Sequence, residues 1–274
     1  MAIRILKNPQ AVIGLVITLF VLSVAVFAPI LAPNDPEQVN IMLKFGSPSE
    51  QYPFGNDALG RCIFSRLIYG ARYSMAVSLP ILIILSAIGL FLGTLSVCGG
   101  KRINAILDYI CNTFIALPQL MVGIALIGML GSGFVNIVIA IVIGMWAWFT
   151  KMVRAYSQVE MGKDYILAAR ISGCGKMKLV FKHLIPNILP QFLVFFSTGI
   201  ATSILMVSIF AFLGLGLPAG TPEWGAMLKD ASTHIYNHPE MLVYPGVCIL
   251  VTSAGFVLFG EAVRDILMSG EDAL

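Results

Sequence analysis

Long apolar stretches free of charge alternate with short polar segments along this chain. A helix needs about 20 apolar residues to cross the core of a bilayer. No charged residue occurs over the 42 positions from Tyr109 to Thr150, which is enough for two spans joined at Gly131–Gly133. We expect six spans in all. They are placed at 11–32, 74–98, 110–130, 134–149, 188–217 and 241–260.

The spans divide the rest of the chain into segments of contrasting composition. A proline-rich polar stretch at 33–73 is expected in the aqueous phase, and five helices form a core at 74–265. Within that core, the most charged stretch is 151–187, and 217–240 is a loop rich in Pro and Gly. Short polar segments at 1–10 and 266–274 complete the predicted organisation.

Composition supports an all-α integral membrane protein. The chain is 58% hydrophobic and 11% charged, with a mean hydropathy of +0.90, whereas soluble domains carry about 25% charged residues. The apolar run at 11–32 is longer than the apolar core of about 7–15 residues in a typical signal peptide, so we expect an uncleaved first span. The five cysteines form no C-x-x-C pair, which argues against a disulfide framework or a zinc knuckle.

The distribution of cations predicts the orientation. With the N-terminus inside, 12 of the 17 lysines and arginines fall on the inner side and 5 on the outer side. An excess of Lys and Arg marks cytoplasmic loops. Both termini and the 151–187 loop are therefore expected in the cytoplasm, and the 33–73 and 217–240 segments outside.

The predicted spans carry no ionisable residue near their middle. Ion-coupled carriers usually place such groups at mid-membrane, so a stand-alone channel or secondary carrier is a weaker interpretation, and a membrane-embedded enzyme weaker still. Small, hydroxyl and thioether residues instead suit helix packing or the lining of a neutral pathway. The candidate pathway residues are Met121, Ser197, Thr198, Thr202, Ser203 and Met206.

The stretch LAARISGCGKMK at 167–178 contains glycines and a lysine and invites comparison with a phosphate-binding loop. A Walker A loop requires G-x-x-x-x-G-K-[ST]. Arg170 stands in place of the first glycine and Met177 in place of the hydroxyl residue. The chain is therefore not expected to hydrolyse ATP itself. Asp164–Ile171 is instead predicted to be a helix, with Asp164 placed favourably at its N-terminus.

Two interpretations of this segment remain open on composition alone. Cations near an amphipathic helix fit a helix lying on anionic lipid. The small residues Ala168 and Ala169, followed by Gly173 and Gly175, fit a slim helix received by a cytoplasmic partner better.

The pattern of this segment resembles the cytoplasmic coupling loop of ABC-importer permeases. In that pattern, an alanine pair is followed after three residues by a glycine, and then by a second helix with a proline. Here the pattern is Ala168-Ala169, Gly173 and Pro186. That family usually carries glutamate before the alanines, where this chain has Leu167. The resemblance implies ATPase-coupling roles for a set of residues in this loop. They are Asp164, Leu167, Ala168, Ala169, Arg170, Gly173, Gly175 and Lys176.

Other motifs extend the resemblance over nearly the whole chain. Segments 54–61, 65–72, 212–216 and 222–225 are similar to the outer loops of dipeptide, oligopeptide and nickel permeases, and 260–265 to their C-terminal signature. The resemblance implies a type I permease fold in a bacterial-type cytoplasmic membrane. It implies a second permease subunit, two ATPase subunits that hold ATP and Mg²⁺, and an extracytoplasmic substrate-binding protein. It implies no cofactor in this chain and no nucleic acid.

Within that group, segments 146–148, 152–154 and 166–168 are most similar to the nickel branch. We therefore expect nickel or a metal chelate as cargo, with di- or oligopeptides as the alternative. His234 and His238 are four positions apart, as metal-binding pairs on helices are. No third ligand is evident near them, so a solvated polar loop is the favoured interpretation and metal binding a minor one.

Overall fold

The structure is a computed structural model that describes the backbone of residues 8–268 and the side chains as far as Arg264. Regular structure over these residues is helical, with one isolated bridge between Asn56 and Cys62. The segments predicted to be cytoplasmic at the two ends, 1–10 and 266–274, lie largely outside the described residues.

Five described helices are long and apolar enough to cross a membrane. A shorter, bent pair of helices makes a sixth span when it is counted as one. The five are α2 (Pro9–Leu31), α3 (Ile63–Cys98), α6 (Phe134–Met161), α11 (Glu240–Met268) and the run from α8 (Lys176–Leu179) through η2 (Val180–Leu184) to α9 (Ile185–Phe212). The expected all-α membrane fold is confirmed.

The expectation of one continuous span at 110–130 is wrong. The chain forms α4 (Lys101–Ile115) and α5 (Gln119–Leu130), which meet at an angle of 80°. Pro118 explains the break, because a proline lacks the backbone donor that a helix interior needs and disfavours helical backbone at the preceding residue. Polar residues occupy much of α4, and only α5 is uniformly apolar.

Other helices differ from the prediction in where they begin and end. Helix α3 begins at Ile63 rather than Ser74, and α6 runs on to Met161 rather than ending at Phe149. The short elements outside the spans are η1 (Ile41–Leu43), α7 (Asp164–Ile171) and α10 (Trp224–Ser232). Helix α7 has the predicted bounds.

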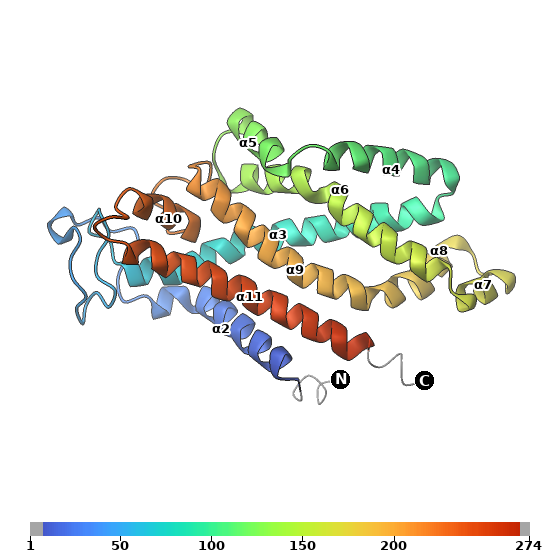
Figure 1. The fold of residues 1–274 in the computed structure, drawn as a ribbon, viewed down its shortest axis with the longest axis horizontal. Coiled ribbons are helices and arrows are strands. Elements are labelled where there is room, and N and C mark those ends of the chain that lie inside the picture. The colour runs from blue at the N-terminus through green and yellow to red at the C-terminus, as the bar shows by residue number, and fades with distance from the viewer. Residues whose placement is uncertain (1–7, 269–274) are drawn as a thin grey trace.

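Helices α3, α6 and α9 pack together at the centre, with α2 and α11 along one side and α4 and α5 along the other (Figure 1). Glycines permit the close approach. A Cβ at Gly93 would lie 2.7 Å from Val153, and one at Gly199 would lie 2.7 Å from Leu82. Small residues at contact points let membrane helices pack by van der Waals contact, where no hydrophobic force drives them together.

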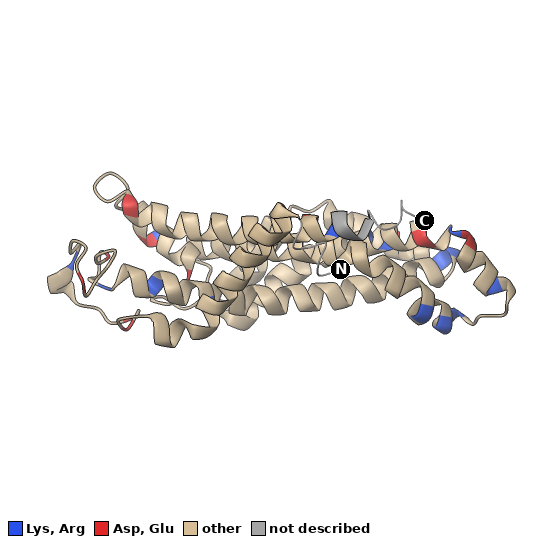
Figure 2. Cartoon of the chain, turned by 90° about the horizontal axis from the view of Figure 1, so that it is seen from below, with Lys and Arg blue, Asp and Glu red and all other residues tan. Residues whose placement is uncertain are grey.

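The polar segments gather at opposite ends of the bundle. The 33–62 loop and α10 lie at one end, and α7 with α8 at the other (Figure 1). Many of the lysines and arginines gather at the α7 end (Figure 2), among them Lys163, Arg170, Lys176 and Lys178. This end is the one predicted to face the cytoplasm, and that orientation stays a prediction.

Candidate coupling and translocation site

The coupling segment, residues 162–184, connects the end of α6 to the start of α9. It consists of α7, a turn at 172–175, α8 and the five-residue π-helix η2. Buried side chains at Ile166, Leu179 and Leu184 fix it against the bundle. The π-helix η2 continues directly into α9, so the segment is joined to that span without a break.

Glu160 provides a polar anchor for the same segment. Its side chain is only 3% exposed, and it forms an ion pair of 3.0 Å with Lys163. The Tyr165 hydroxyl donates to Glu160 Oε1. Burial and this hydrogen bond raise the pKa of the Tyr165 phenol above its ordinary value of 10, so the phenol remains a donor at neutral pH. The start of α7 is thereby tied to the last turn of α6.

The turn after α7 depends on a glycine in the left-handed region. Gly173 has φ +79°, and its N–H donates to Arg170 O at 3.0 Å. The N–H of Cys174 donates to Ala169 O, also at 3.0 Å. These bonds close the helix as a left-handed C-terminal cap does. A Cβ at Gly173 would meet no atom within 4 Å. Glycine is therefore required at this position by the backbone conformation and not by packing.

The outer face of the coupling segment is apolar as well as basic. Of the residues given coupling roles, Asp164, Ala168, Arg170, Gly175 and Lys176 are exposed, and Ala169 is half-buried. The residues with the greatest apolar exposure come from both sides of the turn. They are Leu167, Ile171, Met177 and Phe181. Sequence analysis singled out only Leu167, although the i, i+4 spacing of Met177 and Phe181 indicates a shared helix face.

The six candidate pathway residues do not form one surface. Ser203 is fully buried, Thr198 and Met121 are exposed, and the other three are half-buried. The hydroxyls of Ser197, Thr198 and Thr202 donate to the carbonyl four residues earlier. Such bonds within the helix are typical of serine and threonine in membrane helices.

Gln119 joins Met206 at the break between α4 and α5, and sequence analysis missed it. Its amide Nε2 lies 3.5 Å from Met206 Sδ, which connects the start of α5 to α9. Gly144 of α6 approaches from the other side, where a Cβ would lie 3.3 Å from Gln119 O. Interrupted membrane helices often mark substrate sites in transporters. The position of Gln119 directly after Pro118 was the available signal.

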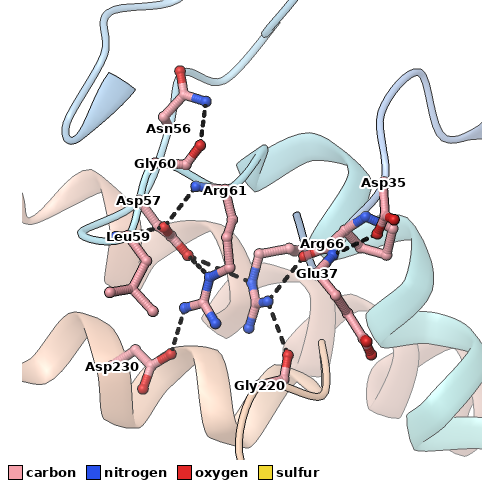
Figure 3. A network of polar contacts seen from close by, with 11 residues as sticks. Asp35, Glu37, Asn56, Asp57, Leu59, Gly60, Arg61, Arg66, Gly220 and Asp230 are labelled. Atoms are coloured by element: carbon pink, nitrogen blue, oxygen red, sulfur yellow. Dashed lines mark hydrogen bonds and ion pairs between the residues drawn. The ribbon is translucent and has the colours of Figure 1, made fainter. Parts of the chain in front are cut away.

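A buried ionic network holds the opposite end together (Figure 3). Asp57 pairs with Arg61 Nε at 2.6 Å and with Arg66 Nε at 3.6 Å, and Arg61 Nη2 reaches Asp230 at 2.9 Å. Arg66 also donates to the carbonyls of Pro36 and Gly220, at 3.1 Å each. The network therefore connects the 33–62 loop, α3, the 218–223 loop and α10.

Glu223 is fully buried between three helices at this end. Its carboxylate accepts hydrogen bonds from the Ser74 hydroxyl at 3.1 Å, the Ser208 hydroxyl at 3.4 Å and the Ala226 N–H at 3.0 Å. Burial raises the pKa of the Glu223 carboxyl above its ordinary value of 4.5. Sequence analysis placed Glu223 within a motif but gave it no role.

The two outer histidines pack against Phe45. The ring of His238 stacks on Phe45 at 4.2 Å, and that of His234 meets it edge-on at 5.0 Å. His238 Nδ1 also lies 3.1 Å from Glu240. Over the described part of the chain, no group of three His, Cys, Asp or Glu residues is placed to hold a metal ion. Both histidines lie beyond the end of α10, His234 in a turn and His238 in irregular backbone just before α11.

Comparison with known proteins connects this geometry to a transport family. Residues 85–270 match the family described as "Binding-protein-dependent transport system inner membrane component", and residues 1–48 match the "N-terminal TM domain of oligopeptide transport permease C".

Curated relatives extend over almost the full length of the chain. The chain is 32% identical to the nickel transport system permease protein NikC of Escherichia coli (strain K12), over 93% of this chain and 92% of the relative. It is 33% identical to the dipeptide transport system permease protein DppC of Alkalihalophilus pseudofirmus, over 95% and 86%. It is 34% identical to the metal-staphylopine import system permease protein CntC of Staphylococcus aureus (strain NCTC 8325 / PS 47), over 99% and 95%.

Proposed function

Because the chain belongs to the binding-protein-dependent inner-membrane components, as a permease of the peptide and nickel ABC importers, we propose that its cargo is nickel or a metal chelate. The chain is a multi-pass membrane permease, and in this family the ATPase resides in separate subunits. The expected resemblance to the peptide and nickel group is confirmed.

Similarity to two metal-related permeases supports this cargo. The relative named for metal-staphylopine import matches over 99% of the chain and 95% of its own length, and the nickel permease over 93% and 92%. The amide of Gln119 and the thioether of Met206 are neutral groups at the helix break. Transport requires that a cargo bind weakly enough to leave. A metal in a chelate already has its ligands, so neutral groups on the protein would bind it weakly and let it pass.

Coupling would use the exposed face of the coupling segment. We assign Asp164, Leu167, Ala168, Ala169, Arg170, Gly173, Gly175 and Lys176, together with Met177 and Phe181, to contact with a cytoplasmic ATPase subunit. Two such subunits would bind ATP and Mg²⁺, and this chain would bind neither. Their closure would move α7, and the continuous path through η2 into α9 would carry that movement to the span that holds Met206.

The remaining partners would be a second, different permease subunit and an extracytoplasmic binding protein. The binding protein would meet the end formed by the 33–62 loop and α10. Di- or oligopeptide import is the second candidate function, favoured by the 33% identity to a dipeptide permease.

Transport by the complete importer tests the cargo. This chain would be reconstituted in liposomes with its partner permease, ATPase and binding protein, and uptake of a radioactive nickel chelate would be compared with that of a radioactive dipeptide. ATP-dependent uptake of the chelate, unaffected by excess dipeptide, is the expected result. Uptake of the dipeptide alone would favour the alternative. Uptake by this chain alone, without ATP, would contradict the coupled mechanism.

A further inference from the structure

An apolar groove of about 540 Å³ opens between α2, α3 and α11, in the half of the bundle next to the 33–62 loop. Phe20, Val24 and Leu31 of α2 form one wall, and Val251 of α11 lies on another. The indole of Trp224, from α10, also lines the groove. Its volume falls within the range of about 300–1,000 Å³ that is typical of sites for small molecules.

Helices α2 and α11 approach each other closely at the end remote from the 33–62 loop. A Cβ at Gly14 would lie 2.4 Å from the backbone nitrogen of Phe259, and one at Gly255 would lie 2.4 Å from Ile17. Ala11 and Ala262 are fully buried against each other. Toward the 33–62 loop, Val24 of α2 and Cys248 of α11 both line the groove.

The mouth of the groove opens sideways through apolar residues. Phe20 is 66% exposed, Val247 50% and Leu31 48%. All three lie within candidate membrane spans, where the hydrocarbon of a bilayer would face the mouth. An empty groove is unfavourable because its lining atoms would lose dispersion contacts. A groove filled with water is also unfavourable, because water needs polar partners and this lining offers few.

We propose that this groove binds one acyl chain of a phospholipid from the leaflet on the side of the 33–62 loop. This site goes beyond the transport of a cargo and does not depend on which cargo is carried. Trp224 makes the site more than a general lipid contact, because its Nε1 donates to Leu67 O at 3.0 Å and its ring fills the space beside Gly70. The acyl chain would thus stabilise the packing of α10 against α3.

The position of the groove favours lipid over the second permease subunit. The exposed pathway candidate Met121 and the break at Pro118 lie on the α4–α5 side of the bundle, where a second half of a pathway would have to join. Helices α2 and α11 lie on the opposite side (Figure 1).

Brominated lipids test the proposal, because bromine quenches indole fluorescence on contact. The chain has three tryptophans, and the double variant Trp146→Phe/Trp148→Phe leaves only Trp224. The full chain would be placed in nanodiscs of phosphatidylcholine brominated at shallow, middle or deep positions of the acyl chains. We expect bromines at shallow to middle positions to quench the emission of Trp224. This residue is only 2% exposed, so quenching would require an acyl chain inside the groove.

Matched variants separate the groove from general lipid contact. Val251→Phe or Cys248→Phe fills the groove and should restore the emission. Val243→Phe adds the same bulk on the same helix, at a residue that is 53% exposed and does not line the groove, and should leave the quenching unchanged. Emission insensitive to bromine, or equal behaviour of Val251→Phe and Val243→Phe, would overturn the proposal.

Two further measurements complete the test. Adding the second permease subunit, with its tryptophans replaced by phenylalanine, should leave the quenching intact. If the emission recovers instead, the occupant is that subunit and the proposal fails. Should the tryptophan double variant not fold, the unaltered chain would be placed in the same brominated nanodiscs, and Val251→Phe should recover part of the total emission while Val243→Phe recovers none. Equal emission from these two variants would contradict the proposal.

Discussion

The hydroxyl of Ser74 donates a hydrogen bond of 3.1 Å to the carboxyl group of Glu223, joining α3 to the start of α10 in a fully buried position. The same carboxyl group accepts from Ser208 of α9. One side chain from the 218–223 loop therefore connects three helices, and the consequences of altering it can be stated in advance.

Glu223→Ala should destabilise the permease, because it leaves two buried hydroxyls and the N-terminal turn of α10 without their acceptor. An unsatisfied buried donor costs about 1–3 kcal/mol. Thermal unfolding of the purified protein in detergent measures the loss. Glu223→Gln, which keeps an acceptor oxygen, is the matched control and should lose less. Equal melting temperatures for Glu223→Ala and the unaltered protein would contradict the bonding described here.

The pH dependence of stability should also depend on Glu223. Burial raises the pKa of its carboxyl group above 4.5, so the folded protein binds a proton more tightly than the unfolded chain. The stabilising contribution is then fully present below about pH 4.5 and declines as pH rises through the folded pKa. Unfolding followed between mildly acidic and neutral pH should show this decline in the native protein. In Glu223→Gln, which cannot ionise, that component should be missing.

Asp57→Asn should be among the most damaging substitutions at the outer end. It removes the carboxylate shared by Arg61 and Arg66, whose side chains are 5% and 2% exposed, and breaking a buried pair from one side costs about 3–5 kcal/mol. Asp230→Asn is the matched control, because Asp230 is 48% exposed and pairs with the same Arg61. An exposed pair contributes at most about 1 kcal/mol. Protease protection of the 33–62 loop should fall sharply in the first variant and little in the second.

How far the sequence anticipates this structure differs between its elements. Helix α7 has the predicted bounds because its start and its glycine turn are local signals. The outer end of α3 was missed because the 33–73 stretch as a whole is polar and rich in proline, whereas Arg66 within it is buried by partners as distant along the chain as Gly220. The break at Pro118 had a local signal, but the absence of charge from Tyr109 to Thr150 outweighed it. Contacts between distant segments, such as Gln119 with Met206, follow only from the packed bundle.

Gly173→Ala should uncouple transport from ATP hydrolysis while the protein still reaches the membrane. The left-handed backbone at Gly173, with φ +79°, costs a residue with a side chain about 1–2 kcal/mol, so the turn between α7 and α8 should rearrange and displace the exposed face of the coupling segment. Gly162 provides a matched control at the start of the same segment, outside the residues assigned to the ATPase contact, because its φ of −83° and ψ of −8° suit any residue and a Cβ there would lie 3.4 Å from Val159 O, in ordinary contact. ATP-dependent uptake in liposomes containing the complete importer should fall strongly with Gly173→Ala and remain near normal with Gly162→Ala. If both variants lost uptake equally, a methyl group at either glycine would be enough to block coupling, and the conformational explanation would be wrong. If neither did, this turn would not belong to the coupling site.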